Sequence, residues 1–254
     1  MTARVPVTPA PDSRRDGGRS ALVWDVLQRV AAARAGQAAR ALDIVDVGGG
    51  TGGFAVPFAA LGHHVTVVDP SPDALAGAQR RAAERQVPLA AVQGDADGLD
   101  HLTGENSADL VICHSVLEYV EDPTAAMAAI ARVLRPGGTV SVLAANAVAA
   151  VLHRALSGRY DQAREILAGI TAGSQADMVV DGRRRFTLAG LTELIEGAGL
   201  RAGQAHGVRV FAGLLPSGDA DQGAGDALRG LEDEAAVYPA LRDIAPRLHV
   251  LGER

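Results

Sequence analysis

The sequence predicts an α/β protein with a doubly wound, mainly parallel sheet. Apolar residues make up 48% of the 254 residues and aromatic residues only 3%, so the core must be built from Val, Leu, Ile and Ala. Short β-branched runs alternate along the chain with segments of helical periodicity. Because parallel neighbours need a crossover between them, this alternation indicates a parallel sheet covered by helices.

The first half of the chain contains most of the expected sheet. Apolar runs bounded by Gly, Asp and Pro predict the strands, and Ser71 with Pro72 predicts a helix N-terminus. In chain order we expect a helix at 21–35, strands at 42–47 and 64–69, a helix from 72 to about 86, strands within "LAAVQGDADGL", "ADLVICHSV" and "GTVSVLAAN", and a helix at 123–134 before the last of these.

The second half departs from this alternation. Residues 146–186 break into short helical pieces at 148–156 and 160–170 and an arginine run at 183–185, and we interpret them as a cap inserted into the domain. Thr187 then caps a helix that ends at glycines. Further along we expect strands near 205–212 and 247–251 with a helix at 227–238 between them. Residues 21–254 are therefore predicted to form one domain, and residues 1–20, which lack an apolar stretch, a disordered lead.

Charge and cysteine usage exclude several classes of protein. The formal net charge is -6 and the chain has no lysine, so there is no general basic field for nucleic acid, and such a substrate would need a local arginine patch. The lone Cys113 rules out an internal disulfide and a multi-cysteine metal site, so no metal is expected. A reducing cytoplasm fits, and we expect neither a signal peptide nor a membrane span.

A glycine-rich loop follows the first predicted strand. Glycine is needed where a ligand approaches the backbone closely. Gly48, Gly50 and Gly53 match a dinucleotide-binding pattern, and Gly48, Gly50 and Gly52 match a methyl-donor loop, so the glycines alone leave both open. Asp69 ends the next strand about 20 residues further on, where a carboxylate can accept hydrogen bonds from both hydroxyls of a ribose.

Five segments together resemble the class I S-adenosylmethionine-dependent methyltransferases: "DVGGGTGG", "VTVVDPSPDAL", "GDADGL", "ADLVICHSVLEYVEDP" and "RVLRPGGTVSV". The "LRPGG" element is the most discriminating, because a nicotinamide oxidoreductase has no role for it. The resemblance implies a Rossmann-like seven-stranded sheet whose last strand is antiparallel. It also implies S-adenosylmethionine as cofactor, with donor-binding residues at Arg19, Asp46, Gly48, Gly50, Thr51, Gly52, Asp69, Asp95, Ala96 and His114.

The chain is further similar to the bacterial tRNA carboxymethoxyuridine methyltransferase group. The similarity runs through "GRSALVWDVLQRV", "ICHSVLEYVEDP", "NAVAAVLHRALSGRYD", "HGVRVF" and "RLHV". At 173–186 the chain departs from that group, because "GRRRF" stands where a lysine-rich stretch is expected. The acceptor is thus either a tRNA wobble uridine or a small metabolite. A row of arginines at the pocket mouth would favour RNA, and scattered arginines a small acceptor.

Two chemistries of oxygen methylation predict different catalytic residues. A carboxylate acceptor is already nucleophilic and needs a cation to hold it, for which Arg209 in "HGVRVF" is the candidate. A hydroxyl acceptor must lose a proton, and His114, His153 and His249 are the candidate bases. Each histidine could equally be structural. Alternatives to a methyltransferase are a nicotinamide oxidoreductase and a catalytically silent donor-binding module.

Overall fold

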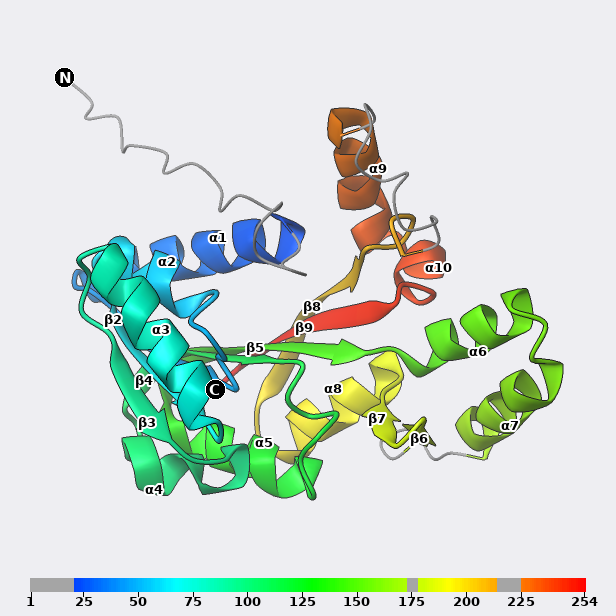
Figure 1. Cartoon of the computed structure of the whole chain (residues 1–254), viewed down its shortest axis with the longest axis horizontal. Helices are drawn as coiled ribbons and strands as arrows, with labels where there is room; N and C mark the ends of the chain where they lie inside the picture. The colour runs from blue at the N-terminus through cyan, green and yellow to red at the C-terminus, as the bar shows by residue number, and fades with distance from the viewer. Residues whose placement is uncertain (1–20, 173–177, 214–224) are drawn as a thin grey trace.

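A computed structural model describes residues 21–172, 178–213 and 225–254 of the chain. Its centre is a seven-stranded sheet with the strand order β3-β2-β1-β4-β5-β9-β8 (Figure 1). The strands are β1 (Asp43–Val47), β2 (His64–Asp69), β3 (Ala90–Gln93), β4 (Ala108–His114), β5 (Leu134–Ala145), β8 (Arg201–Val208) and β9 (Arg247–Glu253). The strand β9 runs in the opposite direction to the other six strands of this sheet, which confirms the predicted architecture.

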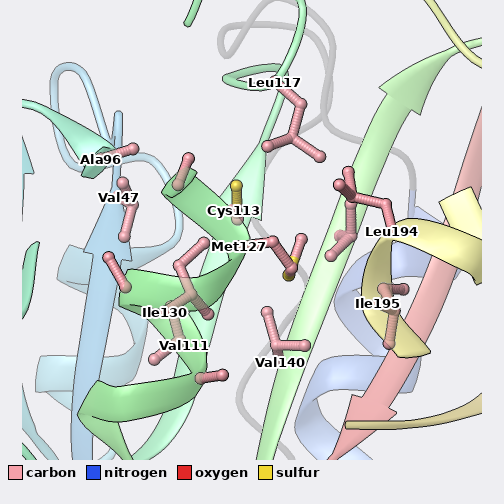
Figure 2. Packing of buried hydrophobic residues seen from close by; sticks show 14 of the residues in the cluster. Val47, Ala96, Val111, Cys113, Leu117, Met127, Ile130, Val140, Leu194 and Ile195 are labelled. Carbon is pink, nitrogen blue, oxygen red and sulfur yellow. The ribbon is translucent and has the colours of Figure 1, made fainter. Parts of the chain in front are cut away.

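Alternate residues of each strand divide the core into two layers. On β4, Leu110 and Ile112 face one layer and Val111 and Cys113 the other, as a strand's two-residue period requires. The first layer is covered by α1 (Ala21–Ala38), α2 (Ala55–Ala60) and α3 (Pro72–Glu84). The second layer, drawn in Figure 2, is covered by α5 (Pro123–Val133) and α8 (Leu188–Gly197). The Cys113 thiol is fully buried, and burial raises its pKa, so it is an inert core side chain.

Local capping signals set the helix starts as expected. The Ser71 hydroxyl accepts a hydrogen bond from Ala74 N at 3.3 Å, and the Thr187 hydroxyl accepts one from Gly190 N at 3.0 Å. Asp122 caps α5 in the same way, with Pro123 in the first helical position. A short helix, α4 (Leu99–Thr103), follows β3. No described helix is both long and apolar enough to cross a bilayer.

The described parts of 146–186, residues 146–172 and 178–186, lie outside the sheet and form two helices and a hairpin, and we call them the cap. The helices α6 (Ala147–Leu156) and α7 (Tyr160–Thr171) project beyond the end of β5 (Figure 1), and both begin and end within a residue of the predicted bounds. They share a small apolar cluster with the hairpin strand β6 (Met178–Val180). The second hairpin strand, β7 (Arg183–Arg185), is the arginine run, and its pairing with β6 was not predicted.

In the last part of the sheet, the strands begin and end at other residues than predicted. The strand expected at 205–212 is β8 at Arg201–Val208, and the chain turns at Arg209, whose φ is +62°. The reason is Glu232 in α9 (Gly225–Val237). Its carboxylate accepts hydrogen bonds from the amides of Val210, Phe211 and Ala212 at 2.7–2.9 Å, so these amides cannot join a strand ladder. The final strand β9 runs to Glu253 rather than ending at 251.

Two glycines of β8 provide a test of this packing. A Cβ on Gly207 would lie 2.7 Å from Cα of Arg242 in α10 (Pro239–Arg242), and backbone cannot move aside cheaply. We expect Gly207→Ala to lower the free energy of unfolding by about 1–3 kcal/mol in urea titrations. Gly203→Ala is the matched control, because its Cβ meets nothing closer than 3.4 Å. Equal stability of the two variants would show that α10 does not pack against Gly207.

Candidate functional site

The glycine loop after β1 has the backbone geometry that its sequence predicted. Gly48, Gly50 and Gly52 have φ values of +61°, +55° and +77°, whereas Gly53 is not among the positive-φ residues. A Cβ on Gly48 would lie 2.5 Å from Val116 Cγ2 in the loop after β4. Both the conformation and this contact therefore demand glycine at position 48. The three positive-φ positions are those of the methyl-donor pattern rather than the dinucleotide pattern.

Asp69, at the end of β2, holds this loop in place. One oxygen of its carboxylate accepts a hydrogen bond from Gly50 N and the other accepts one from Ser71 N, both at 2.9 Å. A carboxylate oxygen can accept more than one hydrogen bond, so each retains capacity for a ligand hydroxyl. The side chain is largely buried yet lines the cavity described next.

A cavity of about 610 Å³ opens at the carboxyl ends of β1 to β4. Four of the predicted donor-binding residues line it: Gly48, Asp69, Asp95 and Ala96. The loop after β4 forms another part of the wall, through Ser115, Val116, Tyr119, Val120 and Glu121. In an open α/β sheet this edge is where ligands bind, so the cavity is the candidate donor site.

Of the other predicted donor-binding residues, those that the structure describes do not line this cavity. Asp46 is buried beneath the loop, where a Cβ on Gly49 would come within 2.7 Å of its carboxyl carbon. Thr51 packs beside Gly77 of α3 instead of facing the cavity. His114 lies at the end of β4, edge-on to the Phe54 ring at 4.9 Å. Arg19 falls outside the described residues.

The arginine run binds the loop that forms the wall of this cavity. Arg184 N donates to Glu118 O at 3.2 Å, and the Arg184 guanidinium donates to the carbonyls of Val120 and Glu121. The Arg183 guanidinium lies 5.2 Å from the centre of the Tyr119 ring, a cation–π distance. The cap is therefore attached to the wall of the donor cavity through β7, an arrangement that no sequence pattern indicated.

Glu118 joins the same loop to the sheet. Its side chain is 7% exposed, and its Oε1 accepts a hydrogen bond from Ala145 N at 2.9 Å. Burial raises the pKa of this carboxyl, although Arg247 and Arg185 oppose the shift. Sequence reasoning missed Glu118, and the signal available was its position four residues after β4 in "HSVLEYV".

Three histidines and a serine form a continuous chain across β4, β5, β9 and β8, in which Ser141, His206 and His249 are buried and His114 is half-buried. Ser141 Oγ lies 2.7 Å from both His114 Nε2 and His249 Nε2, and His249 Nδ1 lies 3.2 Å from His206 Nδ1. Burial lowers the pKa of His114 to about 3 and of His206 to about 4, and lowers that of His249 well below its usual range. All three are therefore neutral at pH 7. Ser141 and His206 were not singled out from the sequence.

The structure does not bring the four candidate catalytic residues together. His114 and His249 belong to the histidine chain, and the His249 side chain is fully enclosed. His153 is exposed on α6 and lines a second, smaller cavity under the cap. Arg209 is exposed at the turn that Glu232 holds, and it does not line the donor cavity. The described residues contain no cluster suited to a metal ion.

Comparisons with known proteins agree with this geometry. The family described as "Methyltransferase domain" matches residues 45–142. The tRNA 5-carboxymethoxyuridine methyltransferase of Escherichia coli O157:H7 is 32% identical over 242 residues, covering 93% of this chain and 88% of that protein. A ubiquinone biosynthesis O-methyltransferase of Xanthomonas oryzae pv. oryzae (strain PXO99A) is 36% identical over 116 residues, covering 45% and 48%. The structure of magnesium protoporphyrin IX methyltransferase from Synechocystis PCC 6803 with bound SAH shares the fold, with a TM-score of 0.59, 15% identity and coverage of 94% and 90%.

The chain therefore belongs to the class I S-adenosylmethionine-dependent methyltransferases. Within that family it is similar along nearly its whole length to the tRNA 5-carboxymethoxyuridine methyltransferase of Escherichia coli. The residues present fit the donor. The loop is bare glycine where a Cβ at position 50 would meet open space, and the Asp69 carboxylate lines the adjoining cavity.

Removing the Asp69 carboxylate tests the donor site. We expect Asp69→Ala to weaken binding of S-adenosylhomocysteine about 100-fold or more, because two charge-assisted hydrogen bonds to a ribose would be lost together with the anchor of Gly50. Isothermal titration calorimetry measures the affinity. Asp73→Ala, in the exposed first turn of α3, is the control and should leave it unchanged. Unaltered affinity in Asp69→Ala would remove the ribose assignment.

The buried histidines predict how stability depends on pH. Their pKa values are depressed in the folded protein, so below pH 6.5 the unfolded chain binds protons that the folded chain does not. The free energy of unfolding therefore decreases as the pH is lowered, until the pH reaches the pKa values of the folded protein. Between pH 6 and 4.5 we expect the free energy of unfolding to drop by about 1.4 kcal/mol per pH unit for each of the three histidines. Urea titrations at several pH values measure the slope.

Two other groups act in the same pH window, in opposite directions. Burial lowers the pKa of His63 and raises that of Glu118, so their effects on the slope offset each other. The variant His206→Asn should reduce the proton uptake on unfolding by about one, whereas Ser141→Ala retains all the histidines and should keep it. A wild-type uptake below about one proton would contradict neutral burial of the cluster.

Proposed function

We propose that this methyltransferase transfers a methyl group to an oxygen atom of a small acidic acceptor bound between the donor cavity and the cap. The observation that carries the proposal is that three arginines of the cap have partners within the protein, although Arg183 among them is exposed. Arg184 bonds backbone carbonyls, Arg183 covers the Tyr119 ring, and Arg154 pairs with Asp181. A polynucleotide backbone needs several exposed cations in a row, and these three are occupied within the protein.

The donor site divides into parts by residue chemistry. We assign the ribose hydroxyls to Asp69, the edge of the adenine to Asp95 and Ala96, and the amino-acid end to the backbone of Gly48, Gly50 and Gly52. Asp46, Thr51, His114 and Arg19 are assigned to the same end by resemblance. S-adenosylmethionine, when bound, supplies an electrophilic methyl group on a sulfonium. The protein's part is to orient the acceptor oxygen in line with that group and to exclude water.

The histidines favour an acceptor that has no proton to lose. A general base works best when its pKa is close to the operating pH, and a pKa of about 3 makes His114 a poor proton acceptor at pH 7. Burial lowers the pKa of His249 as well, and its side chain is fully enclosed. A carboxylate oxygen is already nucleophilic and needs only a cation to hold it, a role for which Arg209 stays a candidate. His153, which is exposed, is the remaining base if the acceptor is a hydroxyl.

A tRNA wobble uridine is the second candidate acceptor. It is favoured by one observation, the 32% identity with a tRNA-modifying enzyme over 93% of this chain. The acidic balance of the chain opposes it, because a net charge of -6 repels a polyanion.

A cytoplasmic location suits either acceptor and remains part of this proposal, as does a single domain spanning residues 21–254.

Radiolabelled donor distinguishes the two acceptors. The enzyme is incubated with methyl-labelled S-adenosylmethionine and, separately, with total tRNA or with an extract of small metabolites. We expect label in the small-molecule fraction as a base-labile methyl ester, which alkaline treatment releases as methanol. Asp69→Ala serves as the inactive control. Label that is recovered only in RNA would refute the small acceptor and establish the second candidate.

A further inference from the structure

A second cavity, of about 170 Å³, lies beneath the cap helix α6. Its walls are mainly apolar, from Ala150, Leu152, Ile244 and Pro246. Two arginines, Arg154 and Arg185, and His153 also line it. The cavity is smaller than those that hold whole drug-sized ligands, so it suits one group of a larger molecule.

Arg185 lacks a close counter-ion in this cavity. Its side chain is half-buried, and its Nε is buried with no hydrogen-bond partner among the described residues. Burial, and to a smaller extent the charge of Arg154, lower the pKa of Arg185. Asp181, the nearest acid, pairs with Arg154, and Glu118 acts on Arg185 only at longer range than an ion pair. A desolvated cation without an anion carries a free-energy cost that a bound anion would remove.

The cavity adjoins the donor site through consecutive residues of one segment. Pro246 lines the small cavity, and the next side chain, Arg247, bonds the hydroxyl of Ser115, which lines the donor cavity. Glu118 interacts electrostatically with both Arg185 and Arg247. A molecule that reaches from one cavity to the other would place one end beside Arg185 and the other beside the donor.

We propose that this small cavity anchors a carboxylate of the acceptor, with Arg185 as its cation and the apolar wall of α6 and Pro246 against its carbon frame. That the bound molecule is the methyl acceptor rests on the proposed function. The binding of an anion in this cavity does not. The anchored group is held apart from the donor, so the oxygen that is methylated is another atom of the same molecule. Arg154 contributes positive charge and stays paired with Asp181.

Side-chain NMR tests the proposal without any methyl transfer. Benzoate is titrated into the full-length protein while the arginine Nε–Hε signals are recorded, and benzamide serves as its neutral isostere. The signal of Arg185 is identified by its loss in Arg185→Gln. We expect benzoate to shift it with an affinity on the order of millimolar, usual for a fragment of this size, and benzamide to leave it in place.

Two variants separate the cavity from general charge effects. Arg185→Gln should weaken benzoate binding about tenfold or more, the cost of losing a charge-assisted hydrogen bond. Arg164→Gln removes the same charge from an exposed position of α7 and should leave the affinity unchanged. If both variants weakened binding equally, the effect would be one of net charge and the site would be refuted.

Three further outcomes would overturn the assignment. No shift of the Arg185 signal at benzoate concentrations on the order of 10 mM would exclude an anion site. Equal binding of inorganic phosphate would show that the apolar wall selects nothing. Displacement of benzoate by an unmodified anticodon stem-loop would assign the site to RNA. Failure of the proposed function is separate, since benzoate binding in an enzyme that methylates no acid would leave the cavity site standing.

Discussion

The loop after β4 is the constraint on which both cavities depend. Its residues form one wall of the donor cavity, its Glu118 carboxylate bonds Ala145 N at the end of β5, and its backbone bonds β7 of the cap. Two further backbone hydrogen bonds join the cap to the end of β5. Phe186 N donates to Ala145 O, and Ala147 N donates to Phe186 O. The cap is thus hydrogen-bonded both to the end of β5 and to the loop that forms part of the donor-cavity wall.

Much of the fold could be predicted because its determinants are local. Strand runs with a two-residue period, capping residues such as Ser71 and Thr187, and a glycine loop all act within a few residues of their own position. The donor side of the site follows from the same logic. A loop after β1 and an acid at the end of β2 must meet at one edge of a parallel sheet, so Gly50 and Asp69 could be placed together from sequence spacing.

The contacts of the cap and of the histidine chain could not be predicted because they join segments that are distant in the sequence. The arginine run gives the same pattern whether it faces solvent or bonds the loop after β4, and only the β6–β7 pairing decides between them. The chain from His114 through Ser141 to His249 likewise requires the register of three strands. The β8 boundary was misplaced for a related reason, since Glu232 in α9 captures amides that the local pattern assigns to a strand.

Electrostatics limits the ways in which a protein of negative net charge can bind an anion. A net charge of -6 gives no long-range attraction for anions, so binding must come from cations held at short range in places that water reaches poorly. A half-buried guanidinium meets that condition, because its attraction for a carboxylate rises as the local dielectric falls. Surface arginines would instead be screened by salt and would recruit polyanions. The pairing of Arg154 with Asp181 and of Arg184 with backbone carbonyls therefore makes these two cations less available to nucleic acid.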